Sequence, residues 1–217
     1  MSTDPGFIHK YLPSSSKTSQ KKARTALLLH GTGANENDLI PIASMIAQDG
    51  NVNILSPRGK VLENGVLPRF FARLSEGVFD IEDLKFRTNE LADFVLSASK
   101  KYDFDPSLVV AIGYSNGANI AASMLLLRPE VLRAAILFRA TLPLVPDKMP
   151  KLTGKKIFMS SGRYDAVVPH QSVSQLKGLF EGAGAKVTLN WEDSSHELTE
   201  DEVEKARLWA VENEIFF

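Results

Sequence analysis

The chain has 217 residues, enough for one substantial hydrophobic core and short for two, so we expect one domain over residues 1–217. Hydrophobic residues make up 44% and charged residues 24%, which excludes a disordered or fibrous protein, and the lack of cysteine excludes disulfide bonds and thiolate nucleophiles. The formal net charge of -1, from 25 basic and 26 acidic side chains, argues against a nucleic-acid partner.

The first residues, 1–16, lack the basic start and the apolar stretch of a secretory signal. Elsewhere, no apolar run approaches the ~20 residues that a helix needs to cross a bilayer. We therefore predict a cytoplasmic protein without a membrane partner. His9 precedes every predicted strand, and we interpret it as a surface or hydrogen-bonded polar residue.

Short runs with strand character alternate with longer stretches of helical spacing. The predicted strands cover residues 25–30, 51–56, 107–113, 133–138, 155–161 and 186–191. The middle runs are apolar throughout, which is typical of parallel strands that are covered on both faces. This alternation predicts an α/β fold, with a mostly parallel central sheet and helices on both faces.

Two helices near the C-terminus have clear boundaries in the sequence. One follows Pro169 and ends at glycines, and the other begins at Thr199 and Glu202, which have the spacing of a capping box. Residues 57–80 fit no regular element. Long loops in compact domains are usually functional or mobile, so this segment is of interest for the site.

The loop His-Gly-Thr-Gly, residues 30–33, follows the first predicted strand. We interpret His30 as a structural residue that holds this loop. The N–H group of Thr32 follows the first glycine and can face a pocket at the end of the strand. A phosphate-binding loop is the alternative, but the segment has neither a lysine at P-loop spacing nor a complete Gly-x-Gly-x-x-Gly motif.

The segment Gly-Tyr-Ser-Asn-Gly, residues 113–117, lies between a predicted buried strand and a helical stretch. In open α/β sheets, ligands bind at the carboxyl ends of the strands. A Gly-x-Ser-x-Gly turn forces the serine into a strained bend, and glycines at 113 and 117 avoid clashes with the neighbouring strand and helix. Ser115 is therefore the candidate nucleophile.

A serine hydroxyl needs a base to take its proton and a carboxylate to orient that base. His196, in the loop after the last predicted strand, is the candidate base, whereas His170 fits a surface position. Asp165 follows the preceding strand, which gives the chain order serine, aspartate, histidine that is typical of α/β hydrolases. Asp193 is the alternative acid, but we interpret it as capping the histidine loop.

An acyl-transfer site also needs hydrogen-bond donors for the oxyanion that develops in the transition state. We expect the N–H groups of Asn116, directly after the nucleophile, and of Thr32 to serve this purpose. Histidines and carboxylates show no recognised metal-ligand spacing, so we predict no metal and no cofactor.

Four motifs spread over residues 27–198 occur in a characteristic order: LLLHGTGANENDL, GYSNGANIAASMLL, GRYDAVVP and SSHEL. On these motifs, the sequence resembles the phospholipase/carboxylesterase family of small α/β hydrolases. Residues 58–91 resemble the insert of a bacterial carboxylesterase branch associated with hydroquinone and quinone resistance. The resemblance implies an α/β-hydrolase fold without a large lid domain, hydrolysis of carboxylic esters or thioesters, and the same triad and oxyanion residues.

The resemblance also places residues 57–80 beside the nucleophile, where Phe70 and Phe71 would form an apolar wall of the substrate site. The arginines near this wall would be Arg58, Arg69 or Arg73. Alternatively, both phenylalanines anchor the segment to the core. The chain departs from many relatives in having Asn116 in place of glutamine, and Arg139 in place of a small residue.

The predicted function is that of a serine carboxylesterase for small esters, linked by the resemblance to quinone and hydroquinone detoxification. A thioesterase or lysophospholipase for long acyl chains is one alternative. A catalytically idle scaffold that binds a small aromatic molecule is another. The expected partner is a small-molecule ester, and the sequence leaves open whether the chain forms a homodimer.

Overall fold

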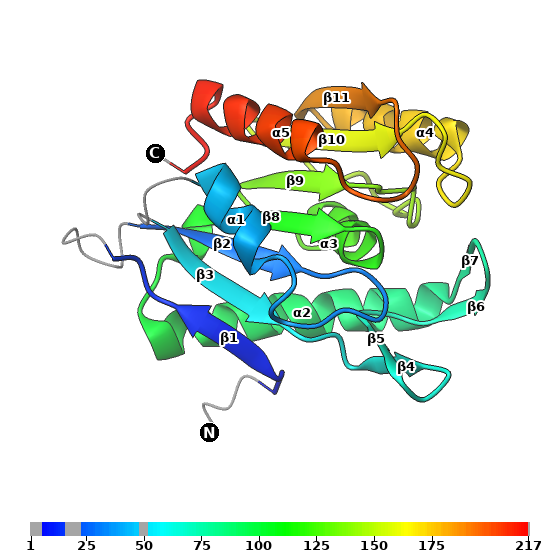
Figure 1. Ribbon diagram of the computed structural model, residues 1–217. Helices are drawn as coiled ribbons and strands as arrows, with labels where there is room; N and C mark the ends of the chain where they lie inside the picture. The colour runs from blue at the N-terminus through cyan, green and yellow to red at the C-terminus, as the bar shows by residue number, and fades with distance from the viewer. Residues whose placement is uncertain (1–5, 16–22, 48–51, 217) are drawn as a thin grey trace.

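A seven-stranded sheet forms the centre of the computed structural model, which describes residues 6–15, 23–47 and 52–216 (Figure 1). From one edge to the other, the strands are β1 (His9–Leu12), β3 (Val52–Pro57), β2 (Arg24–Leu29), β8 (Val109–Tyr114), β9 (Ala134–Phe138), β10 (Lys156–Gly162) and β11 (Lys186–Glu192). Only the β1–β3 pair is antiparallel among the strand pairs of this sheet in the described ranges. The predicted, mostly parallel sheet is confirmed.

Helices cover both faces of the sheet in the described residues (Figure 1). They are α1 (Ile40–Ala47), α2 (Ile81–Tyr102), α3 (Asn116–Leu127), α4 (His170–Gly182) and α5 (Glu200–Glu212). On β2, Leu27 and Leu29 belong to the core that α2, α3 and α4 cover. Ala26 and Leu28 belong to the core on the other face, with α1 and α5. Both faces of the strand are therefore buried, which explains its continuous apolar sequence.

The six predicted strands are present, with bounds that agree to within two residues. The helix after Pro169 is also present as α4, and α5 begins at the predicted capping box. The Thr199 hydroxyl accepts the N–H of Glu202, and the Glu202 carboxylate accepts the N–H of Thr199. No helix in the described ranges is both long and apolar enough to span a bilayer.

Residues 57–80 contain regular structure, so the prediction of an irregular segment is wrong. Two antiparallel hairpins lie here: β4 (Val61–Glu63) with β5 (Leu67–Arg69), and β6 (Arg73–Ser75) with β7 (Val78–Phe79). Asn64 and Gly65 both have positive φ at the first turn. An Asn-Gly pair is the strongest short signal for a hairpin. The connection between β3 and α2 therefore consists of two small hairpins, and no large lid domain lies among the described residues.

The N-terminal segment contributes the edge strand β1, which the sequence did not reveal. His9 lies on this strand. Its Nδ1 donates to the carbonyl oxygen of Phe7 at 2.6 Å, and its Nε2 lies 2.7 Å from the hydroxyl of Tyr102 on α2. The interpretation of His9 as a hydrogen-bonded polar residue is therefore confirmed.

Candidate active site

Ser115 lies in a sharp turn between β8 and α3. Its backbone has φ 52° and ψ -114°, an unfavourable conformation for a residue with a side chain. A Cβ at Gly113 would lie 2.7 Å from the carbonyl oxygen of Gly117, and one at Gly117 would lie 1.9 Å from the carbonyl oxygen of Leu29. The two glycines are therefore required, as predicted. The turn presents the serine hydroxyl at the carboxyl end of the strand.

Three side chains that are distant in the sequence meet at this edge of the sheet. The Oγ of Ser115 lies 3.0 Å from Nε2 of His196, and Nδ1 of His196 lies 2.8 Å from Oδ2 of Asp165. Because a carboxylate can only accept, Nδ1 carries the proton of a neutral imidazole and Nε2 accepts from the serine hydroxyl. This arrangement can draw the proton from a serine that attacks a carbonyl carbon.

The structure brings Asp165, and not Asp193, to the histidine. The side chain of Asp165 is buried, and its Oδ1 accepts the N–H groups of Val167 at 2.8 Å and Val168 at 3.1 Å. These bonds leave Oδ2 to face the imidazole. The Asp193 side chain is 74% exposed and pairs with Arg163 at 3.0 Å.

The loop that carries His196 is held by Arg139, a role that sequence analysis missed. Arg139 is fully buried. Its Nε donates to the carbonyl oxygen of Ser195 at 3.0 Å, and its Nη2 donates to that of Glu197 at 2.5 Å. The residues on both sides of the histidine are therefore fixed by one guanidinium. The hydroxyl of Tyr114 also donates to the carbonyl oxygen of His196, at 2.9 Å.

A buried carboxylate balances the charge of Arg139. Oε2 of Glu202 lies 2.6 Å from Nη1 of Arg139 and accepts the hydroxyl of Ser160 at 2.7 Å. Oε1 accepts from Nη2 of Arg139 at 2.8 Å and from the N–H of Thr199 at 2.7 Å. Glu202 thus has two roles: it is the glutamate of the capping box of α5, and it is the counter-ion of Arg139.

Replacing Arg139 with methionine is expected to lower the free energy of unfolding by about 3 to 5 kcal/mol, because Glu202 would remain buried without its partner. The double change Arg139→Met and Glu202→Met should cost less than the sum of the single changes, since it removes both charges. Urea unfolding of the unchanged protein, Arg139→Met, Glu202→Met and the double variant measures this coupling. Arg207→Met is the control, because Arg207 pairs with Glu204 at the surface. An equal loss in the control would contradict the prediction.

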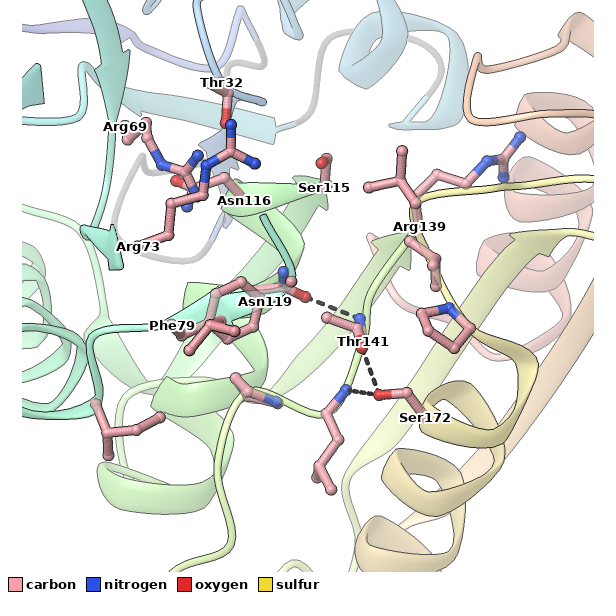
Figure 2. A pocket seen from close by; sticks show the side chains of 18 residues that line it. Thr32, Arg69, Arg73, Phe79, Ser115, Asn116, Asn119, Arg139, Thr141 and Ser172 are labelled. Atoms are coloured by element: carbon pink, nitrogen blue, oxygen red, sulfur yellow. Dashed lines mark hydrogen bonds between the residues drawn. The ribbon is translucent and has the colours of Figure 1, made fainter. Parts of the chain in front are cut away.

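Thr32 and Asn116 line the same cavity as Ser115 (Figure 2). Asn116 is the first residue of α3, where backbone N–H groups have no partner within the helix. Among the described residues, neither the N–H of Thr32 nor that of Asn116 has a hydrogen-bond partner. The structure thus places two free backbone donors at the cavity that Ser115 lines.

The cavity has a volume of about 460 Å³ and lies between the hairpins and the start of α4. Arg69 and Arg73 line it, together with Phe79 of β7. Phe70 and Phe71 do not: they are 2% and 0% exposed and belong to the core. This placement corrects the expectation that they form a wall of the substrate site, and it matches the alternative that they anchor the segment.

The anchoring of the segment reaches the serine turn directly. The N–H of Phe70 donates to Oδ1 of Asn116 at 2.8 Å, and the Phe70 ring packs against His30 with centroids 4.8 Å apart. Arg58 lies outside the cavity and pairs with Glu36 at 2.6 Å. Of the three arginines considered, two therefore reach the site.

The remaining histidines lie outside this arrangement. Nε2 of His30 accepts the N–H of Gly59 at 3.0 Å, and its Nδ1 donates to the carbonyl oxygen of Gly31 at 2.7 Å. Burial lowers the pKa of His30, which favours the neutral ring that these bonds require. His170 is exposed at the start of α4 and donates to the carbonyl oxygen of Arg163 at 3.0 Å. In the described ranges, no cluster of three histidines or carboxylates is arranged to hold a metal ion.

The chain matches known proteins over nearly its whole length. The model of the Phospholipase/Carboxylesterase family matches residues 14–209. MhqD of Bacillus subtilis (strain 168) is 45% identical over 186 residues, which cover 86% of this chain and 92% of MhqD. The crystal structure of a Bacillus cereus carboxylesterase is 44% identical, with a TM-score of 0.91 and coverage of 97% of this chain and 96% of that chain.

A third relative is YahD, whose structure was determined with malic acid. It is 31% identical, with a TM-score of 0.86, and the match covers 95% of this chain and 99% of YahD. The α/β-hydrolase fold and the resemblance predicted from the motifs are confirmed by these matches. The chain belongs to the phospholipase/carboxylesterase family, and it is a carboxylic ester hydrolase.

Proposed function

We propose that the chain is a serine carboxylesterase for small esters, with Ser115 as nucleophile, His196 as general base and acid, and Asp165 as the group that orients the imidazole. The observation that carries this proposal is the pair of hydrogen bonds through His196. They join Oγ of Ser115 to Nε2 at 3.0 Å, and Nδ1 to Oδ2 of Asp165 at 2.8 Å. A serine hydroxyl alone is a poor nucleophile, so both bonds are needed for the chemistry.

The reaction has two steps. In the first, Ser115 Oγ attacks the ester carbonyl carbon while His196 Nε2 takes the hydroxyl proton and then gives it to the departing alcohol. In the second, His196 takes a proton from a water that attacks the acyl carbon, the bond from that carbon to Ser115 Oγ breaks, and His196 returns the proton to Oγ as the acid leaves. In both steps, the N–H groups of Thr32 and Asn116 stabilise the negative charge that develops on the carbonyl oxygen.

The cavity favours a small and polar acyl group over a long alkyl chain. Its volume of about 460 Å³ is near the lower end of the usual range for ligand pockets. Asn119, Thr141 and Ser172 bring polar groups to its far side (Figure 2). The structure of the relative YahD is one with malic acid, a small polar carboxylic acid. The link to quinone and hydroquinone detoxification stays a prediction from the sequence resemblance.

Brief mixing with 4-nitrophenyl acetate is expected to add one acetyl group to Ser115, because the nucleophile forms a covalent intermediate before water enters. Intact-mass spectrometry detects the adduct, and peptide mapping locates it. The palmitate ester should acylate the protein more slowly, since its long alkyl chain would lie against the polar groups of Asn119, Thr141 and Ser172. Faster acylation by palmitate would favour the thioesterase or lysophospholipase alternative.

The same samples test whether the protein is a catalytically idle scaffold. A fluorophosphonate should label Ser115 stoichiometrically, because it reacts with activated serine hydroxyls. An unlabelled Ser115, together with no acetyl adduct, would reject the esterase proposal. Labelling at another residue would reject this assignment of the nucleophile.

A further inference from the structure

The cavity beside Ser115 carries an excess of positive charge. Three arginines line it, Arg69, Arg73 and Arg139, and no aspartate or glutamate of the described residues does. The charge of Arg139 is already balanced by Glu202 at 2.6 Å. The excess therefore comes from the two arginines of the hairpin segment.

Arg69 and Arg73 share a single carboxylate. Nη1 of Arg69 lies 2.5 Å from Oε2 of Glu63, and Nη2 of Arg73 lies 2.6 Å from Oε1. Burial raises the pKa of Glu63, but the hydrogen bond from Arg73 and the charge of Arg69 outweigh burial and lower it, so the carboxylate is ionised. Two positive charges and one negative charge leave one positive charge uncompensated.

The two arginines differ in what they can still bind. The side chain of Arg69 is 5% exposed, and its Nε donates to the carbonyl oxygen of Phe71 at 3.2 Å, so it is fixed in the hairpin. The side chain of Arg73 is 33% exposed, and Nη2 to Glu63 is its one hydrogen bond within the described part of the chain. In Figure 2, it extends toward Thr32 and Asn116. Its Nε and Nη1 groups are therefore available to a ligand.

The amide side chains of the cavity also have unused donors. Oδ1 of Asn116 accepts the N–H of Phe70, while its buried Nδ2 has no partner within the described ranges. Oδ1 of Asn119 accepts the N–H of Thr141 at 2.9 Å, and its amide nitrogen makes no hydrogen bond to a described residue. Buried donors without partners are rare in proteins. A ligand that supplies an oxygen acceptor can bind the amide nitrogen of Asn119, whereas Nδ2 of Asn116 is enclosed by protein atoms.

The position of the cavity indicates which part of an ester it holds. The leaving alcohol must lie next to His196, which protonates it. His196 is not among the residues that line the cavity, whereas Thr32 and Asn116, the proposed oxyanion donors, are. The cavity therefore lies on the acyl side of Ser115.

We propose that the preferred substrates are esters whose short acyl group ends in a carboxylate, that is, monoesters of small dicarboxylic acids. This inference rests on the proposed esterase function. The terminal carboxylate pairs with the outer edge of the Arg73 guanidinium, where Nη1 and the second N–H of Nη2 can donate two parallel hydrogen bonds. Arg73 is then a specificity-determining residue that acts on the substrate and takes no part in the proton transfers.

Monoethyl succinate and ethyl butyrate test this inference, because they share a four-carbon acyl group and the same leaving alcohol. We expect kcat/KM to be about tenfold higher for the succinate ester than for the butyrate ester. This is the effect of one hydrogen-bonded charge pair that is partly exposed to water. The preference should decrease as salt screens the pair. In Arg73→Gln, kcat/KM for monoethyl succinate should fall about tenfold, while that for ethyl butyrate stays within about twofold.

Arg58→Gln is the matched control, since Arg58 belongs to the same segment but pairs with Glu36 away from the cavity. It should keep the preference of the unchanged protein. Equal turnover of both esters, or equal losses for both in Arg73→Gln, would overturn the inference while leaving ester hydrolysis intact. If neither ester is hydrolysed and Ser115 is not acylated by 4-nitrophenyl acetate, the proposed function itself has failed.

Discussion

Replacement of Ser115 by alanine is expected to lower kcat for ester hydrolysis by about a millionfold, as in serine hydrolases in which the nucleophile acts as one unit with its histidine. The change removes only Oγ. The side chain makes no capping hydrogen bond to α3, and alanine keeps the Cβ that the turn already accommodates at φ 52°. The melting temperature should therefore hardly change. Release of 4-nitrophenolate measures activity, and circular dichroism measures the unfolding transition.

Ser123→Ala is the control for this variant. Ser123 lies on the same helix, is fully buried, and its Oγ has no hydrogen-bond partner in the described ranges. Its replacement should leave turnover unchanged. Full activity in Ser115→Ala would show that another group attacks the ester, and unfolding of that variant would show that the turn depends on the hydroxyl.

Asp165→Asn is expected to lower kcat by about ten thousandfold, because asparagine favours the wrong tautomer of His196. Oδ1 of the new side chain can still accept the N–H groups of Val167 and Val168, so its amide group must face Nδ1. An amide donor requires Nδ1 to accept. The ring proton then moves to Nε2, which can no longer take the proton of Ser115.

Asp193→Asn provides the matched comparison, since it makes the same chemical change three residues before the histidine. Asp193 is exposed and pairs with Arg163 at the surface, so activity should change by less than about twofold. Steady-state kinetics with 4-nitrophenyl acetate compare the two variants. A larger loss in Asp193→Asn than in Asp165→Asn would exchange the proposed roles of the two acids.

Much of the fold could be predicted because its signals are local. Each central strand is a continuous apolar run, and the capping box at Thr199 marks the start of α5 without reference to the rest of the chain. The meeting of Ser115, Asp165 and His196 followed from topology, because loops after parallel strands share one edge of the sheet. The hairpins of residues 57–80 were missed, although Asn64 and Gly65 carry a recognised turn signal.

The interactions that hold the candidate catalytic residues in place could not be predicted, because they are contacts between segments that are distant in the sequence. Arg139 was recognised as unusual for the family, but its partners lie on the histidine loop and on α5. Glu202 fits a capping box so well that nothing in the sequence suggests a second partner. Phe70 and Phe71 are apolar residues in a functional segment, and only packing determines whether such residues face a ligand or the core.

The shared carboxylate of Glu202 links the C-terminal helix to the proposed chemistry. Any fluctuation that frays the first turn of α5 also removes the counter-ion of Arg139, the residue that holds the backbone on both sides of His196. Local disorder at the start of α5 and displacement of the His196 base are then coupled in one opening event. The free energy of fraying this helix would then be the smallest free energy of opening that inactivates the enzyme, and it would be smaller than the free energy of unfolding the central sheet.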